Sequence, residues 1–224
     1  MNINGIIDHT ILKADAKQEE LLSYSDEAKE FGFASVVVNS VNIPFIAKKL
    51  KGSGINIAAV VGFPLGAMLT SVKAFETSEC VKMGADEIDM VINIGALKDK
   101  DYKTVEEDIR AVVEASGDAV VKVIIETCLL SDEEKIMASN LSVKAGANFV
   151  KTSTGFSTGG ATTGDIELIK KTVGDSALVK ASGGVRSLEQ ALDLINAGTD
   201  RIGAGDGKLL GKRYKKTGQV KGEY

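Results

Sequence analysis

Short runs of β-branched and other apolar residues alternate along the chain with longer stretches in which apolar residues recur every three to four positions. The second pattern is typical of amphipathic helices and covers residues 17–31, 69–83, 103–115, 132–145, 163–172 and 187–197. Several of these stretches open on Ser, Thr or Asp, which cap helix N-termini. We therefore predict strands that alternate with helices along most of the chain.

A glycine precedes many of the apolar runs, as expected where a helix ends before a strand. Four of these glycines, Gly32, Gly84, Gly146 and Gly198, are 52, 62 and 52 residues apart, and further apolar runs fall between them. With the run near the N-terminus there are eight runs in 224 residues, or about 28 residues per unit. Repeated strand–helix units form parallel sheets with right-handed crossovers.

Eight such units without a linker favour an α/β fold of the (β/α)8 TIM-barrel class. The predicted organisation is a single domain over residues 1–224 that ends in a short flexible polar tail, from about residue 212. An open, doubly wound sheet stays as the alternative, because periodicity alone does not show that a sheet closes.

Composition narrows the functional class. A hydrophobic fraction of 44% and only two cysteines exclude a disordered chain and a disulfide scaffold, so we expect free thiols and a cytoplasmic protein. A net charge of -4 gives no footprint for nucleic acid or an anionic membrane, and the apolar runs are too short to span a bilayer. One histidine, His9, and no CxxC pair make a zinc site unexpected. We expect no metal and no cofactor, and chemistry carried by Lys, Asp, Glu, Ser or Thr.

Polar residues interrupt four consecutive apolar runs. They are Asp89 in the fourth, Lys122 and Glu126 in the fifth, Lys151 in the sixth and Lys180 in the seventh. Alternation along a strand places Lys122 and Glu126 on one face. If Lys151 and Lys180 also face inward, three ammonium groups and two carboxylates meet in one lumen, near the strand ends where barrel active sites lie.

For any one of these lysines, a structural ion pair or an extended side chain that reaches solvent is an adequate explanation. Three lysines on adjacent strands favour a functional explanation instead. A second cation nearby lowers the pKa of a lysine, and the free amine that results attacks carbonyl groups. Asp89 is expected to serve the same cluster, because it lies in an otherwise apolar strand beside it.

Glycine-rich loops follow the last three apolar runs, at residues 152–160, 182–186 and 203–207. Loops in this position, at helix N-termini, form the usual phosphate site of a barrel. Arg186 is a candidate helper, and the predicted phosphate-binding residues are Gly155, Gly183, Gly184, Gly203, Gly205 and Asp206. A free amine, acid–base groups and a phosphate site together predict a class I, Schiff-base aldolase acting on a small carbonyl phosphate.

Six segments carry more specific motifs: IDHTILK (7–13), EIDMVIN (87–93), KVIIET (122–127), FVKTSTGF (149–156), KASGGVR (180–186) and RIGAGDG (201–207). Together they resemble the deoxyribose-phosphate aldolase family, in order and over residues 7 to about 210. The resemblance implies reversible cleavage of 2-deoxy-D-ribose 5-phosphate to D-glyceraldehyde 3-phosphate and acetaldehyde, a step in deoxyribose phosphate catabolism.

The resemblance also implies roles for individual residues. Lys151 would form the Schiff base, Lys180 would handle protons, and Asp89 would complete the catalytic group. Lys122 and Glu126 would tune this network. Asp8, predicted late in the first strand, would either order it or cap a turn or helix.

The chain departs from the family pattern at two places. Where relatives carry a serine pair, this chain has Gly205 and Asp206, and a carboxylate repels a phosphate dianion, so we expect a weaker preference for phosphorylated sugar. Val37 stands where relatives often have a cysteine, a change expected to affect aldehyde tolerance at most. Tyr224, at the end of the tail, is either a proton relay or without function.

Two other functions stay open: another Schiff-base barrel aldolase with an altered or unphosphorylated substrate, and a non-catalytic barrel that binds a phosphate ligand. The expected partners are a sugar phosphate, acetaldehyde and further copies of the chain in a homodimer or homotetramer.

Overall fold

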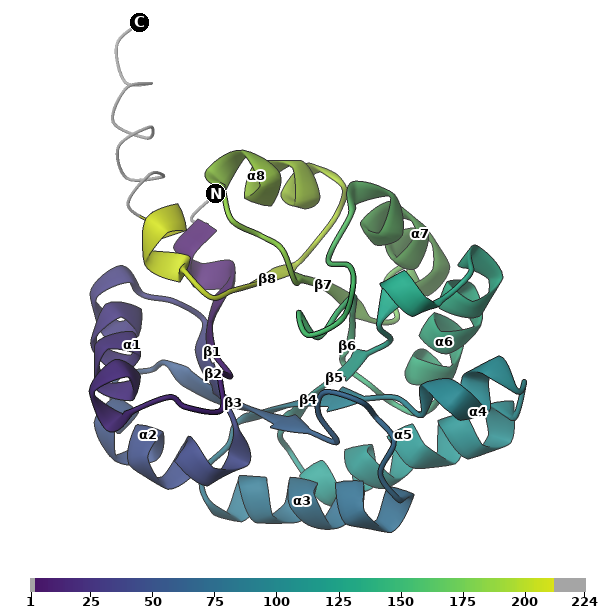
Figure 1. The fold of residues 1–224 in the computed structure, drawn as a ribbon, viewed down its shortest axis with the longest axis horizontal. Helices are drawn as coiled ribbons and strands as arrows, with labels where there is room; N and C mark the ends of the chain where they lie inside the picture. Colours follow the sequence, from purple (N-terminus) through teal and green to yellow (C-terminus); the bar gives the residue numbers. More distant parts are fainter. Residues whose placement is uncertain (1–2, 212–224) are drawn as a thin grey trace, which may run out of the picture.

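Eight parallel strands form a closed barrel in the computed structural model, which describes residues 3–211 (Figure 1). In chain order they are β1 (Ile7–Ile11), β2 (Ser35–Val38), β3 (Asn56–Val61), β4 (Glu87–Val91), β5 (Val120–Ile124), β6 (Phe149–Lys151), β7 (Leu178–Ser182) and β8 (Arg201–Ala204). β8 pairs with β1, with Ile202 opposite Ile7. This pairing confirms the predicted barrel and excludes the open sheet. The predicted tail, 212–224, and Tyr224 lie outside the described residues.

Helices surround the barrel (Figure 1). They are α1 (Gln18–Phe31), α2 (Ile43–Leu50), α3 (Thr70–Lys82), α4 (Ile94–Lys98), α5 (Tyr102–Ser116), α6 (Asp132–Lys144), α7 (Thr163–Val173) and α8 (Leu188–Asn196), with 3-10 turns at Ile3–Ile6, Ser40–Asn42 and Thr127–Leu129. The six predicted helices agree with α1, α3, α5, α6, α7 and α8 to within one residue at each end. The two that were not predicted, α2 and α4, have 8 and 5 residues, too few for a periodic pattern to stand out.

The capping residues and the glycine that were predicted to begin and end helices do so in the structure. The hydroxyl groups of Ser131, Thr162 and Ser187 each accept a hydrogen bond from a backbone N–H in the first turn of α6, α7 and α8. The glycine of the repeat ends α1 as a left-handed cap at Gly32, where φ is 67°. A side chain at this position would be strained, so the glycine lets the chain turn from helix to strand.

Two apolar clusters divide the interior. The larger one lies between the helices and the outward faces of the strands, and includes Ile88 and Met90 of β4 with Val105 and Ile109 of α5. The smaller one is formed by Leu12, Val37, Ala58 and Val60 with Phe63. Residues of β3 alternate between the two clusters, so the smaller cluster faces the lumen. The part of the lumen next to these residues of β1 to β3 is therefore apolar.

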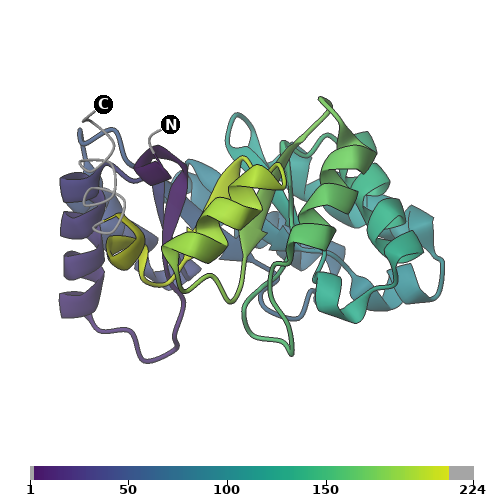
Figure 2. The same ribbon diagram turned by 90° about the horizontal axis from the view of Figure 1, so that it is seen from above.

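The loops that follow β1 and β6 project from the same end of the barrel (Figure 2). This is the end at which the parallel strands terminate, and it is where barrel enzymes assemble their active sites. Within residues 3–211, no helix combines the length and hydropathy needed to cross a bilayer.

Candidate active site

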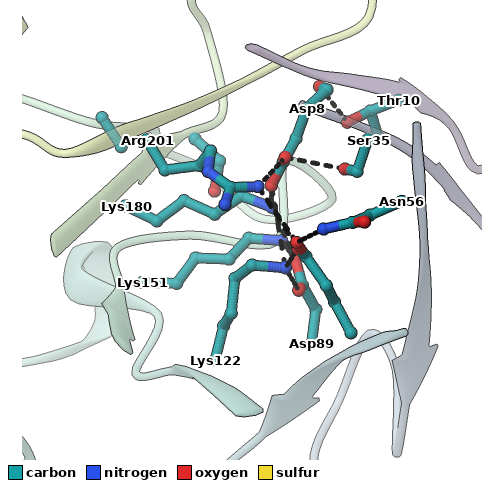
Figure 3. Close-up of polar contacts among 12 residues, drawn as sticks. Asp8, Thr10, Ser35, Asn56, Asp89, Lys122, Lys151, Lys180 and Arg201 are labelled. Carbon is teal, nitrogen blue, oxygen red and sulfur yellow. Dashed lines mark hydrogen bonds and ion pairs between the residues drawn. The ribbon is translucent and has the colours of Figure 1, made fainter. Parts of the chain in front are cut away.

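Asp89 binds three lysines at once inside the barrel (Figure 3). Its Oδ1 accepts from Lys122 Nζ at 2.7 Å, and its Oδ2 accepts from both Lys151 Nζ and Lys180 Nζ, also at 2.7 Å. The strand register produces this meeting, because Asp89 lies opposite Lys122 and Lys151 lies opposite Lys180. All four side chains are almost completely buried. The structure thus brings together four of the five polar residues that were predicted on β4 to β7, all except Glu126.

Lys151 is the last residue of β6 and has an unusual ionisation. Burial lowers its pKa to about 8, and the ammonium groups of Lys180 and Lys122 act in the same direction, against the opposing carboxylate of Asp89. At pH 7 a lysine with this pKa is a free amine in roughly a tenth of the molecules, far more than an ordinary lysine. Lys151 can therefore act as a nucleophile towards a carbonyl group.

Asp89 and Lys122 keep their charges. Burial alone would raise the pKa of Asp89, but the three lysines outweigh it and hold that pKa well below its usual range. Burial would likewise lower the pKa of Lys122, but Asp89, Asp8 and Glu87 together raise it above its ordinary value. Lys122 is consequently a fixed cation beside a fixed anion.

Asp8 joins the cluster from β1, where it is the second residue of the strand and not a late one as predicted. Its carboxylate pairs with Lys180, accepts from Ser35 Oγ at 2.7 Å and pairs with Arg201 Nη1 at 2.7 Å. Burial would raise the pKa of Asp8, but the neighbouring cations, Lys180 first among them, hold it far below its usual range. Of the two roles expected for Asp8, ordering the network fits these contacts, and capping a turn or helix does not.

Two residues of this network were missed from the sequence. Glu87 pairs with Lys122 and accepts from Asn56 Nδ2 at 2.9 Å. Arg201 Nη1 reaches both Asp8, at 2.7 Å, and Glu87, at 3.3 Å. Both lie at the start of a strand, two positions before a predicted site residue on the same face. The two-residue spacing along a strand is the signal in the sequence that points to Glu87 and Arg201.

Glu126 lies two residues past the end of β5 and contacts a different part of the site from Lys122. The regular strand stops at Ile124, and the backbone of Glu126 is left-handed, with φ of 55°. Its carboxylate instead accepts from Thr154 Oγ1 at 2.5 Å and from Thr154 N at 3.3 Å. Glu126 therefore holds the loop that follows Lys151.

A cavity of about 500 Å³ opens at the carboxyl end of the strands, with Lys151 in its wall. The loops after β6, β7 and β8 contribute most of its lining, and all six predicted phosphate-binding residues are part of it: Gly155, Gly183, Gly184, Gly203, Gly205 and Asp206. Arg186 also lines it, and so does Leu12, which belongs to the apolar cluster around Val37. A single space thus offers a reactive amine, glycine loops and an apolar wall.

Gly203 leaves space for the side chain of Lys180. A Cβ atom at this position would lie 2.9 Å from Ser182 Cβ and 3.3 Å from Lys180 Cε. Any larger residue would displace these side chains, so glycine is required for the observed position of Lys180.

Asp206 caps the helical turn that begins at Gly207, because its Oδ1 accepts from Leu209 N at 2.9 Å. The N-terminus of a helix favours a negative group, and this group can be a carboxylate or a phosphate. Here the carboxylate of Asp206 lies at the helix N-terminus, in the wall of the cavity.

The carboxylates of Asp8, Glu87 and Asp89 are paired with lysine and arginine, and residues 3–211 contain no group of three His, Cys, Asp or Glu side chains placed to hold a metal ion. Cys80 and Cys128 are both unpaired. Burial raises the pKa of the Cys80 thiol to about 12, whereas Cys128 is exposed.

The chain is similar to known proteins along most of its length. A family model described as DeoC/LacD family aldolase matches residues 5–216. The deoxyribose-phosphate aldolase of Streptococcus equi subsp. zooepidemicus is 58% identical over 212 residues, which cover 95% of this chain and 96% of that protein.

Two solved structures are similar over most of the chain. A putative deoxyribose-phosphate aldolase from Coccidioides immitis superposes with a TM-score of 0.94 at 38% identity, covering 96% of this chain and 86% of that one. A tetrameric deoxyribose phosphate aldolase from Aeropyrum pernix gives a TM-score of 0.90 at 30% identity, covering 96% and 92%. With the family model spanning nearly all of the barrel, the chain belongs to the DeoC/LacD family of aldolases.

Proposed function

We propose that this protein reversibly cleaves 2-deoxy-D-ribose 5-phosphate to D-glyceraldehyde 3-phosphate and acetaldehyde through a Schiff base on Lys151. One observation carries the proposal: the amine of Lys151, with its pKa lowered to about 8, lies against Asp89 and opens onto the cavity formed by the glycine loops. The similarity to proteins named deoxyribose-phosphate aldolase supports the choice of substrate.

In the synthetic direction, the lone pair of Lys151 Nζ attacks the aldehyde carbon of acetaldehyde and forms a C–N bond. One proton passes from the nitrogen to the former carbonyl oxygen and an acid supplies a second, so that the oxygen leaves as water and a protonated Schiff base remains. Asp89 and Lys180 are placed to move these protons, because Lys180 and Lys151 share Asp89 Oδ2 and their nitrogens are at most two hydrogen-bond lengths apart.

The positive charge on the Schiff base acidifies the adjacent methyl group. Loss of one of its protons, through Asp89, Lys180 and a water molecule, gives an enamine. The enamine carbon attacks the aldehyde carbon of glyceraldehyde 3-phosphate, and as the new C–C bond forms the carbonyl oxygen takes up a proton and becomes a hydroxyl group. Water then hydrolyses the protonated Schiff base that results, which releases the sugar phosphate and the free amine of Lys151. Lys122 takes no proton in this scheme, since its raised pKa keeps it an ammonium that holds Asp89 in place.

Different walls of the cavity face the two ends of the substrate. The loops after β6, β7 and β8 offer backbone N–H groups to the phosphate, and glycine at 183 and 184, with φ of 83° and 76°, permits the tight course of the second loop. Leu12, next to Val37, offers an apolar surface to the two-carbon end.

Activity on an unphosphorylated sugar is a second candidate, favoured by the carboxylate of Asp206 in the cavity wall. This group repels a phosphate dianion but has little effect on a hydroxyl group. Comparing kcat/KM for deoxyribose 5-phosphate and deoxyribose decides between the two substrates.

We further propose that the chain forms a homodimer or homotetramer in the cytoplasm. Leu65, Leu69 and Phe75, on α3 and the loop before it, are 74%, 73% and 66% exposed, which is unusual for such large apolar side chains. The tetrameric Aeropyrum pernix relative supports assembly in principle, and the two free thiols suit a reducing compartment. Light scattering on the purified protein at micromolar concentration tests assembly, and a monomer mass would contradict it.

The reaction is tested by measuring release of acetaldehyde and glyceraldehyde 3-phosphate from deoxyribose 5-phosphate. Wild type is expected to release both in equal amounts. Lys151→Met is expected to lose at least about a thousandfold in kcat, since it removes the nucleophile. Lys103→Met, which changes a side chain that is 83% exposed, serves as the matched control and retains full activity.

A further inference from the structure

The loop after β8 forms one wall of the cavity and is held from outside by β1 and α1. Gly205 and Asp206 line the cavity. Tyr24 Oη, on α1, donates to the Gly205 carbonyl oxygen at 2.7 Å, and Gly207 N donates to His9 Nδ1, on β1, at 3.3 Å. Neither contact belongs to the lysine cluster, so the chemistry described above uses neither side chain.

His9 is built into this support. Its side chain is 1% exposed, and its ring stacks on Tyr24 with centroids 4.1 Å apart and an interplanar angle of 12°. Its Nε2 lies 2.9 Å from Glu27 Oε2, and Glu27 Oε1 binds Lys208 Nζ at 2.9 Å. Since Gly207 N–H donates to Nδ1, the proton of the neutral ring is on Nε2 and is donated to Glu27.

Gly207 packs tightly against the histidine. A Cβ atom there would lie 3.0 Å from His9 Nδ1 and 3.0 Å from Ile7 Cγ2. A glycine at this position therefore allows the loop to approach β1 closely enough for the hydrogen bond to His9.

The contact with Tyr24 fixes the direction of a backbone donor. The carbonyl of Gly205 and the N–H of Asp206 belong to one planar trans peptide unit, in which the two groups point in opposite directions. Tyr24 binds the carbonyl on the side of α1, so the N–H of Asp206 points away from α1. Backbone N–H groups of this kind bind a phosphate only when they are aimed at it.

We propose that Tyr24 and His9 are positioning residues for the phosphate of the substrate, which hold the loop after β8 so that its backbone donors face the cavity. The inference rests on the proposed function. It assigns to α1 and to the only histidine of the chain a part in substrate preference, although neither Tyr24 nor His9 lines the cavity.

Tyr24→Phe tests the first contact, because it removes the hydroxyl donor and keeps the ring that stacks on His9. We expect kcat/KM for deoxyribose 5-phosphate to fall about fivefold, the effect of one lost hydrogen bond, mainly through KM. For unphosphorylated deoxyribose it should stay unchanged. Tyr102→Phe makes the same chemical change in a half-buried tyrosine at the start of α5 and is the control.

His9→Asn and His9→Leu test the second contact as a matched pair of nearly equal shape. Both lose the aromatic ring, but Asn Oδ1 takes the place of Nδ1 and can accept from Gly207 N, whereas Leu cannot. His9→Asn should therefore retain more of the preference for phosphorylated substrate than His9→Leu. A purely structural role of the ring predicts equal losses in both variants and for both substrates.

Titration calorimetry with inorganic phosphate provides the same comparison without turnover. The Kd for phosphate should rise about fivefold in Tyr24→Phe and stay unchanged in Tyr102→Phe. Equal Kd values in wild type and Tyr24→Phe, parallel losses for both sugars, or a wild type that binds no phosphate would overturn the inference. Failure of the proposed function shows itself differently, as a wild type that binds phosphate but cleaves neither sugar.

Discussion

Three lysines share the carboxylate of Asp89, and their surroundings separate their roles. Lys122 has three carboxylates around it, from Asp8, Glu87 and Asp89, and these raise its pKa. Lys151 has only Asp89 and faces two other cations, so burial lowers its pKa to about 8. The number of carboxylates around each ammonium decides which lysine is the nucleophile. The sequence indicated the lysines and Asp89. Glu87 and Arg201 precede predicted site residues by two positions, but their partners depend on the register across the barrel.

The first prediction concerns pH. Only the neutral amine of Lys151 attacks, so kcat/KM should rise with pH and level off above about 8. Lys180→Met removes a cation that disfavours the charged form of Lys151, so the pKa seen in the profile should move upward. The activity lost relative to wild type should then be larger at pH 7 than at pH 9. An unchanged midpoint in the kcat/KM profile of Lys180→Met would show that Lys180 does not tune Lys151.

The second prediction concerns Asp206. Asp206→Ser removes a negative charge from the cavity wall but leaves an oxygen that can cap the turn at Gly207. The ratio of kcat/KM for deoxyribose 5-phosphate to that for deoxyribose should rise about fivefold or more, because repulsion of the phosphate is relieved. Asp206→Asn, which also keeps a capping oxygen, should give a similar rise. An unchanged ratio in both variants contradicts this account of Asp206.

At the scale of elements, helix boundaries were predictable because capping residues and apolar periodicity coincide, as at Ser131 and Ser187. The surroundings of Glu126 were not predictable from strand alternation, because β5 ends at Ile124 and the backbone of Glu126 is left-handed.

The packing of α3 on α5 contains an ion pair that the sequence did not indicate. Lys73 Nζ donates to Asp108 Oδ2 at 2.6 Å and to the Val91 carbonyl at 2.9 Å, and both side chains are fully buried.

The third prediction follows from that pair. Lys73→Met leaves the carboxylate of Asp108 buried without its cation, and we expect the free energy of unfolding to fall by about 3–5 kcal/mol. Lys103→Ala, which breaks an exposed pair with Glu107 on α5, should cost about 0.5 kcal/mol or less. Urea unfolding followed by circular dichroism measures both. Equal small changes would show that Asp108 finds other partners or loses its charge at little cost.

At the scale of the whole molecule, apolar residues lie in the lumen towards the carboxyl ends of β1 to β3, and a network of charged residues from β1, β4, β5, β6, β7 and β8 lies beside them. The ion pair between Asp8 and Arg201 links the first and last strands, where the barrel closes. Sequence predicted the number of strands and the class of fold, because the repeat of about 28 residues is regular. The repeat favoured a closed barrel without showing closure, and it did not indicate this ion pair, because its two residues are 193 positions apart.

The fourth prediction concerns acid unfolding. The pKa values of Asp8 and Asp89 are lowered in the folded state, so the stability they contribute is present above their unfolded pKa, near 3.8, and is lost as pH falls below it. Asp8→Asn should be less stable at pH 7. Below pH 3.8 its free energy of unfolding should depend less on pH, by about 1.4 kcal/mol per pH unit, since one proton fewer is taken up on unfolding. Identical slopes in urea titrations at pH 2.5 to 4 would contradict the assignment.

The central claim is that Lys151 forms the Schiff base, and trapping tests it most directly. Wild type is incubated with acetaldehyde, reduced with borohydride, digested and mapped by mass spectrometry, with Lys151→Met treated in parallel. We predict an N-ethyl group on Lys151, with Lys122 and Lys180 unmodified, and no such adduct at the site in Lys151→Met. An unmodified Lys151, or an adduct on Lys180 in its place, would contradict the account.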